Sequence, residues 1–392
     1  MDCMNKKICM IGFGEMGKRH AKDMDEFSEG SIEVAGVFDP DDRSYEIGCE
    51  WTGKRPRRFD TIKSMIDTIS PDGVIIASPN SLHLSCLREF NGLNIPIILE
   101  KPLDTDMAKV VEIVRFVENY QAPVMVHHVM RYSPIVIKAK ELLDAGELGE
   151  LCSFVMVQNG GGGMFHNFRR TFKTGGGQLL EKATHDFDVL LFLAGAYPRR
   201  VAAICKRQYY GGIKPDTLRC RECNENQTCP HVVIKPSSAN DTVSRNDLCV
   251  FSREIDIFDN ETCVIELDNG IFGTYSECFF SNAPFTRRSE FSGKEGFLSI
   301  DFSAGTLLLK SIKRGIQTFE FDYNQRIHYN GAPGVTRHFY DLMSNHNLKV
   351  HSPVKDAFIA ELISFAAYKA NSEKRFVDIA ELVTPDLKKT LA

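Results

Sequence analysis

The chain has 392 residues, of which 43% are hydrophobic and 25% charged, so its composition is globular and excludes wholesale disorder. Its 47 Lys and Arg residues against 52 Asp and Glu residues give a net charge of -5, which argues against nucleic acid as a partner. No apolar run is long enough for a membrane helix and no signal-peptide pattern precedes the first motif. We therefore expect a soluble, cytoplasmic protein of two domains with no membrane partner.

The first third of the chain alternates short apolar runs with stretches of helical spacing. The expected strands are 7–11, 32–38, 73–77, 97–99 and 123–126, and the expected helices are 16–27, 64–69, 82–90 and 107–120. Short, continuously apolar strands separated by helices indicate an α/β domain whose parallel sheet is covered on both faces.

The first expected strand runs into a complete G-x-G-x-x-G made of Gly12, Phe13, Gly14, Glu15, Met16 and Gly17. Gly12 permits a tight turn, Gly14 lets the backbone approach a pyrophosphate, and Gly17 allows a helix to pack closely on a strand. Asp39 ends the next strand, about 20 positions further on, where its carboxylate can bind ribose hydroxyls and repel a 2′-phosphate. An ordinary glycine turn is the alternative, but the context favours a Rossmann domain that binds NAD rather than NADP.

Polar residues also follow the third and fourth expected strands, at the sheet edge where such folds bind ligands. They are Ser78, Pro79, Asn80 and His83 after the third strand, and Glu100, Lys101 and Pro102 after the fourth. Apart from Pro102, we assign them to the cofactor site, with Lys101 as a candidate for proton transfer. Judged alone, a lysine in a turn is more often a surface residue.

The string from Ile98 to Pro102, after such a fingerprint, resembles the glucose–fructose oxidoreductase/inositol dehydrogenase/MocA family. Residues 78–83, 128–134 and 145–149 also resemble segments of that family. The resemblance implies that Lys101 lies beside the nicotinamide and the substrate and assists proton transfer. It also brings His128 into the cofactor-binding set and Arg131 into the substrate-binding set.

Beyond about residue 151, strand-like runs dominate, at 152–157, 201–206, 262–267, 271–279, 296–302, 306–312 and 317–321. Asn269-Gly270 predicts a hairpin with a primed turn, and 354–371 has helical spacing. We expect a Rossmann domain over 1–130 and an α+β domain over 131–392 with a large open antiparallel sheet. The resemblance implies that this second domain binds substrate and associates into a homodimer or homotetramer.

A second candidate site follows the glycines at 175–177. On one continuous helix, Glu181, His185 and Asp188 would share a face, and a carboxylate can orient a histidine ring. An amphipathic helix with a polar face is the alternative. The resemblance implies a role for His185, although Glu181 and Ala183 stand where the family has Asp and Gly. We assign catalysis to Lys101, Glu181, Lys182 and His185, while noting that Lys182 can also be read as structural.

Basic residues lie just ahead of these glycines, in a glycine-rich loop. They can bind an acidic group on a sugar, or they can form a solvated loop. The predicted substrate-binding residues are Lys101, Arg131, His166, Arg169, Arg170, Glu181 and His185.

Three of the 12 cysteines are bunched in a polar loop at about 218–232. Cys220, Cys223 and Cys229 have C-x2-C-x5-C-P spacing, which is typical of zinc ligands. The fourth ligand is Cys249 or His231. We favour a structural zinc site, with free thiols and an iron–sulfur centre as alternatives.

These features predict an NAD-dependent oxidoreductase that transfers hydride between nicotinamide and a secondary hydroxyl of a sugar, sugar derivative or cyclitol. One alternative is an NAD-dependent glycoside hydrolase that oxidises, eliminates, adds water and reduces back, acting on an acidic sugar. A dinucleotide sensor without catalytic activity is another.

Overall fold

The structure is a computed structural model that describes residues 5–233, 247–280, 285–322, 329–383 and 387. Its strands are β1 (Lys6–Ile11), β2 (Ile32–Phe38), β3 (Arg57–Phe59), β4 (Gly73–Ile76), β5 (Ile97–Leu99), β6 (Val124–Val126), β7 (Leu151–Asn159), β8 (Pro198–Lys206), β9 (Asn260–Leu267), β10 (Phe272–Cys278), β11 (Thr286–Gly293), β12 (Gly296–Asp301), β13 (Thr306–Ser311), β14 (Gly315–Glu320) and β15 (Val377–Asp378). Its α-helices are α1 (Glu15–Phe27), α2 (Asp42–Thr52), α3 (Ile62–Ile69), α4 (His83–Arg88), α5 (Met107–Glu118), α6 (Pro134–Asp144), α7 (Phe172–Gly175), α8 (Gln178–Glu181), α9 (Thr184–Ala194), α10 (Ala332–Ser344) and α11 (Val354–Glu373).

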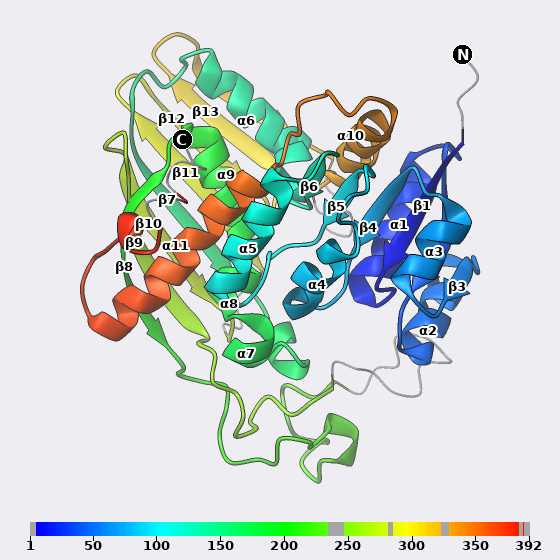
Figure 1. The fold of residues 1–392 in the computed structure, drawn as a ribbon. Helices are drawn as coiled ribbons and strands as arrows, with labels where there is room; N and C mark the ends of the chain where they lie inside the picture. Colours follow the sequence, from blue (N-terminus) through cyan, green and yellow to red (C-terminus); the bar gives the residue numbers. More distant parts are fainter. Residues whose placement is uncertain (1–4, 234–246, 281–284, 323–328, 384–386, 388–392) are drawn as a thin grey trace.

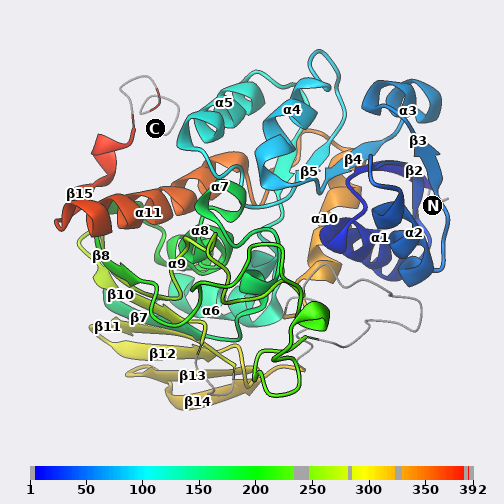
Figure 2. The same cartoon turned by 90° about the horizontal axis from the view of Figure 1, so that it is seen from below.

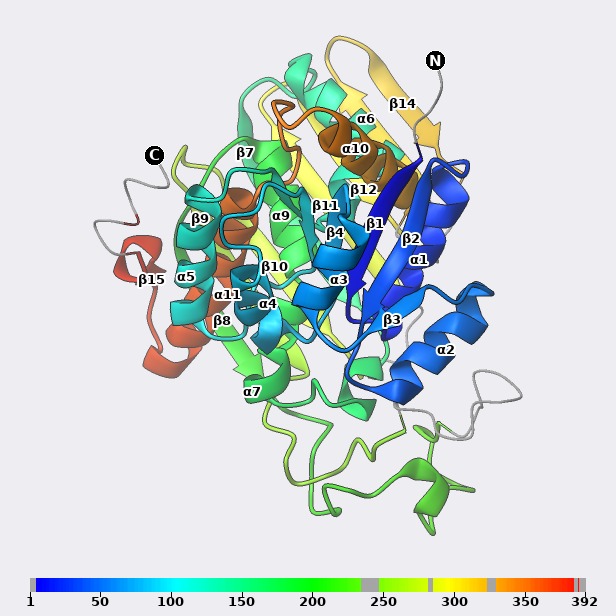
Figure 3. The same ribbon diagram turned by 45° about the vertical axis from the view of Figure 1, so that its right-hand side comes forward.

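The N-terminal sheet has the order β3-β2-β1-β4-β5-β6, and its pairings are parallel (Figure 1). Helices α1, α2 and α10 contribute to the hydrophobic core on one face, and α3, α4 and α5 to the core on the other (Figure 3). This arrangement confirms the predicted Rossmann architecture. Strands β2 and β5 have the predicted bounds, whereas β3 and α2 were not predicted.

Helix α10 belongs to the N-terminal core although it comes late in the chain. A Cβ atom built on Gly73 of β4 would lie 2.7 Å from Phe339 Cζ and 2.6 Å from Met343 Sδ. The glycine therefore lets α10 pack directly against the parallel sheet. The division of the chain at residue 130 stays a prediction, and the packing of α10 crosses it.

The second sheet has the order β14-β13-β12-β11-β7-β10-β9-β8-β15. Its pairings are antiparallel apart from the parallel pair β7–β10, so the sheet is mixed, where we predicted an antiparallel one. In Figure 2, helices α6, α9 and α11 lie along one face, and no helix of the described residues covers the other. The large open sheet is thus confirmed. Strand β11, which is mostly polar, was not predicted.

The hairpin between β9 and β10 forms where it was predicted, but the turn type differs. Gly270 has a φ of 86°, whereas Asn269 is not in the left-handed region. Leu267 N–H donates to Ile271 O at 2.8 Å, which closes a three-residue loop. Such loops combine a type I turn with one left-handed residue, so a single glycine is enough.

No helix among the described residues combines the length and the apolar character that crossing a membrane requires.

Candidate active site

The glycine fingerprint adopts the geometry that a dinucleotide needs. Gly12 has a φ of 88°, and a Cβ atom there would lie 2.6 Å from Ala77 O. A Cβ atom on Gly17 would lie 2.1 Å from Gly12 O, so α1 packs directly on the loop. Gly14, the residue before α1, faces open space. These residues fit a bound pyrophosphate at the start of α1.

Asp39 lies beside this loop at the end of β2. Its Oδ2 accepts a hydrogen bond from Phe13 N–H at 2.7 Å, and its Oδ1 accepts one from Asp41 N–H at 2.9 Å. The carboxylate is therefore fixed next to the glycine turn, as a ribose-binding group should be. Contact with the cofactor stays a prediction for this residue and for the fingerprint as a whole.

His83 joins the two loops that follow β4 and β5. Its ring nitrogens lie 3.1 Å from Ser78 O and 3.0 Å from Leu103 O, and the side chain is fully buried. We predicted His83, Ser78, Pro79 and Asn80 as cofactor-binding residues. In the structure both ring nitrogens of His83 contact the backbone of the loops that it connects, so this side chain can support the cofactor site only indirectly.

Glu100 is buried and contacts the backbone of Lys101, the next residue in the chain. Its Oε1 lies 2.6 Å from His20 Nε2 and 2.9 Å from His127 Nδ1, and its Oε2 accepts a hydrogen bond from Lys101 N–H at 3.1 Å. Burial acts to raise the pKa of Glu100, but the charge and hydrogen bonds of His127 and His20 hold that pKa well below its usual range. A carboxylate thus fixes the backbone of the proposed catalytic lysine. His20 and His127 were not predicted as partners of Glu100, because they come from distant elements.

Lys101 connects the two halves of the site. Its Nζ donates to Glu181 O at 2.7 Å and lies 3.9 Å from Glu181 Oε1. We predicted one continuous helix through Glu181 and His185, and this was wrong, because α8 ends at Glu181 and α9 begins at Thr184. In an unbroken helix, Glu181 O would accept the N–H of His185. Here that N–H faces Lys182 O at 3.4 Å, and Glu181 O accepts Lys101 instead.

Cationic groups surround the Glu181 carboxylate. Arg169 forms an ion pair with its Oε1, and Asn80 Nδ2 donates to its Oε2 at 3.3 Å. Burial acts to raise the pKa of Glu181, but Arg169, Lys101 and Lys182 keep it below its usual range. Glu181 therefore remains a carboxylate at neutral pH and organises the cations around it.

Lys182 lies at the break between α8 and α9. Burial lowers its pKa to about 8, and the nearby cations Arg169, Lys101 and Arg287 act in the same direction against Glu181. A lysine with this pKa can exchange a proton near neutral pH. The catalytic role of Lys182 stays a prediction.

His185 lies next to His128, with ring centroids 5.9 Å apart in an edge-to-face arrangement. His128 Nδ1 is 3.7 Å from Asp188 Oδ2. Burial lowers the pKa of His128 to about 4, which keeps this imidazole neutral at pH 7. His185 therefore has an uncharged imidazole ring beside it.

Arg131 supports this histidine pair. Its Nε and Nη2 donate to Asp188 at 2.8 and 2.7 Å, and its Nη1 donates to Asp356 Oδ2 at 2.7 Å. The side chain is buried. We predicted Arg131 as a substrate-binding residue, but its guanidinium is committed to these two carboxylates.

Arg170 and His166 also turn away from Glu181. Arg170 is buried, and it donates to Glu254 Oε1 at 2.6 Å and to Cys249 O at 2.9 Å. His166 Nδ1 lies 3.0 Å from Leu248 O. Of the three predicted substrate-binding residues in this stretch, the structure brings Arg169 to the Lys101–Glu181 cluster and directs Arg170 and His166 toward the cysteine-containing segment.

An NAD-binding oxidoreductase is the class of protein that these features define. They are the glycine loop at the start of α1, the carboxylate after β2, and the polar cluster to which connections of both sheets contribute. Comparison with known families agrees: the family model described as "Oxidoreductase family, NAD-binding Rossmann fold" matches residues 6–128, and the model described as "GFO/IDH/MocA C-terminal domain" matches residues 136–299. The chain belongs to the GFO/IDH/MocA family and is an NAD-dependent oxidoreductase.

Individual relatives are distant. The chain is 25% identical to YteT of Bacillus subtilis, over 82% of this chain and 78% of that protein. It is 26% identical to an inositol 2-dehydrogenase of Rhizobium meliloti, but covers 58% of that protein, less than two thirds of its length. The solved structure of a levoglucosan dehydrogenase with NADH and levoglucosan matches the fold with a TM-score of 0.77 at 18% identity, covering 96% of this chain and 100% of that one. The glycosidase alternative finds no support in these comparisons.

Proposed function

We propose that the protein oxidises a secondary hydroxyl of a sugar, sugar derivative or cyclitol and passes the hydride to NAD. The observation that carries the proposal is the Lys101–Glu181 contact, which joins the end of a Rossmann strand to the α8–α9 break of the second domain. The names of the inositol 2-dehydrogenase and the levoglucosan dehydrogenase support polyhydroxylated ring substrates. Arg169 can donate hydrogen bonds to such a ring.

The chemistry needs a base and a group that holds the oxygen. NAD, when bound, supplies the acceptor for the hydride. As the C–H bond breaks, the hydroxyl proton passes to a base of this chain and a carbonyl forms. The Lys101 ammonium is suited to hold the reacting oxygen, and Lys182 and His185 are the candidate bases. We favour Lys182, because its pKa of about 8 is close to neutral pH.

The test incubates the purified protein with NAD and a panel of sugars, cyclitols and aryl glycosides. Reduced nicotinamide and released aglycone are followed in the same wells. We expect one reduced nicotinamide per ketone formed. Aglycone release without net reduction would overturn the proposal in favour of a redox-assisted glycosidase, and inactivity in both channels across the panel would remove its support.

A further inference from the structure

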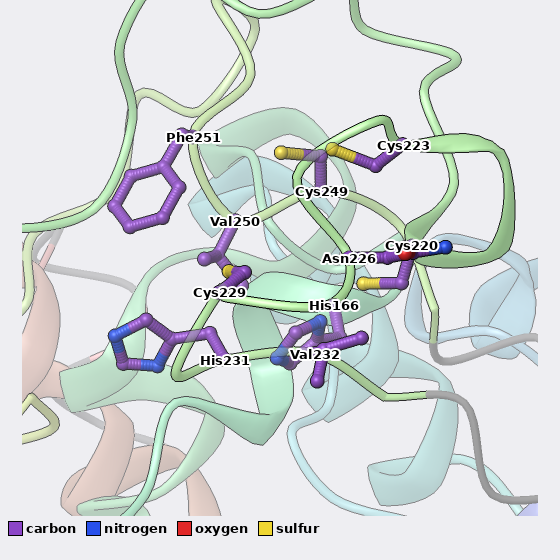
Figure 4. Close-up of a pocket in the computed structure, with 10 residues that line it drawn as sticks. All are labelled: His166, Cys220, Cys223, Asn226, Cys229, His231, Val232, Cys249, Val250 and Phe251. Carbon is purple, nitrogen blue, oxygen red and sulfur yellow. The ribbon is translucent and has the colours of Figure 1, made fainter.

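Four cysteines gather in a segment that the proposed reaction does not use. Cys220, Cys223, Cys229 and Cys249 line one pocket, together with His166 and His231 (Figure 4). Cys249 N–H donates to Leu218 O at 2.8 Å, and Cys220 N–H donates to Asp247 O at 2.6 Å. The fold thus brings Cys249 to the C-x2-C-x5-C motif.

The segment has little regular secondary structure. Between Tyr210 and Val250, its regular structure among the described residues is one short 3-10 turn, Cys220–Glu222, and isolated bridges such as Arg219↔Leu248. Its tip extends away from both sheets (Figure 1). A bound metal can contribute folding free energy to a segment of this kind.

We propose that Cys220, Cys223, Cys229 and Cys249 bind one structural zinc ion. Structural zinc sites are tetrahedral, with four Cys or His ligands, and a C-x2-C pair supplies two of the ligands from one turn. Lys214 forms an ion pair with Glu225 and also lies near enough to Cys223 and Cys249 to interact electrostatically with both.

The histidines in the pocket are engaged elsewhere. His231 Nε2 lies 2.8 Å from Tyr209 Oη, and its ring packs against Tyr210 and Phe251. His166 bonds to the Leu248 carbonyl through Nδ1. Cys249 is therefore the better fourth ligand.

The thiols must draw together when the ion binds. Among the described residues, the ligand atoms that already lie within 4.8 Å of one another belong to His20, Glu100 and His127, not to the cysteines. The histidine–glutamate group is closed by its own short hydrogen bonds. Closing the cysteine site requires side-chain rotations in a loop, which metal binding commonly drives.

The proposed zinc site is connected to the active site through the backbone. Leu248 N–H donates to His166 O at 3.0 Å, and Arg170 Nη1 donates to Cys249 O at 2.9 Å. Arg169 lies in the chain between His166 and Arg170, which these bonds hold in place, and it forms an ion pair with Glu181. Zinc would therefore hold Arg169 in place, a consequence that rests on the proposed function, whereas zinc binding itself does not.

The primary experiment counts metal. Wild type, Cys223→Ser, Cys249→Ser and the control Cys152→Ser, an exposed cysteine on β7, are purified under reducing conditions, incubated with zinc and desalted. We expect about one zinc per chain in wild type and Cys152→Ser, and a large loss in the other two. Wild type with no more zinc than Cys223→Ser, or iron with sulfide in place of zinc, would overturn the proposal.

A measurement on wild type alone guards against misfolded variants. Cobalt replaces zinc in the same protein, and its absorption spectrum reports the ligands. Intense sulfur-to-cobalt charge transfer with tetrahedral d–d bands is the expected result, and an octahedral spectrum without that charge transfer would contradict a thiolate site. Zinc content and cobalt spectra do not depend on dehydrogenase activity, so the two proposals can fail separately. If both hold, Cys249→Ser should raise the substrate KM and leave NAD affinity unchanged.

Discussion

Lys101, at the end of β5, donates a hydrogen bond to the main-chain carbonyl of Glu181 at 2.7 Å. The carbonyl is available because the chain leaves helical geometry between α8 and α9. The contact links the end of a parallel-sheet strand to the α8–α9 break and keeps Lys101 Nζ 3.9 Å from Glu181 Oε1. The catalytic proposal depends on this geometry.

Replacing Lys101 tests its role in holding the reacting oxygen. Lys101→Met should lower kcat by about 10²- to 10³-fold, because it removes the charged donor that holds the reacting oxygen. Steady-state kinetics with NAD would measure the loss, with fluorescence titration to confirm that NAD still binds. Lys63→Met, at an exposed lysine on α3, is the matched control and should keep wild-type activity. Full activity in Lys101→Met would contradict the assignment.

Lys182 should make stability depend on pH. Its pKa is lowered to about 8 in the folded protein from 10.5, so the protonated form is less stable in the native state than in the unfolded chain. This loss of folding free energy is complete below pH 8 and becomes smaller as the pH rises toward 10.5. Relative to Lys182→Met, the wild-type free energy of unfolding should rise by about 3 kcal/mol across this window. Urea denaturation of both proteins at pH 7.5 and 10.5 measures the difference, and an unchanged difference would exclude the pKa shift.

Glu181 should set the pH at which the base loses its proton. Its charge raises the pKa of Lys182, against burial and the other cations. Glu181→Gln should therefore move the lower limb of the kcat profile to more acidic pH, along with a drop in kcat. Profiles of both proteins over pH 5.5 to 10 give the comparison. A limb that stays in place would point to His185 as the base.

Asp39 should determine the choice between NAD and NADP. Asp39→Asn keeps an acceptor for Phe13 N–H but removes the negative charge. NADP affinity should rise relative to NAD, by about tenfold or more, because a buried charge no longer repels the 2′-phosphate. Fluorescence titration with both reduced cofactors tests this, and an unaltered ratio would place the discrimination elsewhere.

The uncovered face of the large sheet should associate with a second copy. Val155 and Val264 are exposed and both pair with Thr274 of β10, and Phe272 is exposed one position along the same face. Exposed apolar side chains on one uncovered face of a sheet are typical of an oligomer interface. We expect a homodimer or homotetramer by light scattering, weakened by Val264→Glu and not by the control Ile213→Glu, an exposed residue outside the sheet. A monomeric wild type would disprove it.

The sequence was informative wherever one pattern determined one local structure. The glycine fingerprint, the carboxylate at Asp39 and the apolar strands β2 and β5 were all predictable, since each depends on near neighbours. Strand β3 was missed, because Arg57–Phe59 is three residues long and carries two arginines.

Features that depend on distant residues could not be predicted. The helix breaks after Glu181 where Lys101, 80 positions away, takes its carbonyl. Arg131 is committed to Asp188 and Asp356, and Arg170 to Glu254, through pairings that no local spacing reveals. The contacts of His20 and His127 with Glu100 are a further example, because only the packing of helix α1 against the sheet brings these residues together.

The most direct test of the account follows the hydride itself. A substrate found in the panel is deuterated at the carbon that bears the oxidised hydroxyl and is incubated with NAD and the wild-type protein. Mass spectrometry then shows whether the deuterium is in the nicotinamide, and the amount of deuterated nicotinamide is compared with the amount of ketone formed. The account predicts one deuterated reduced nicotinamide for each ketone formed; label that stays in the substrate-derived product or appears in water, without net reduced cofactor, would contradict it.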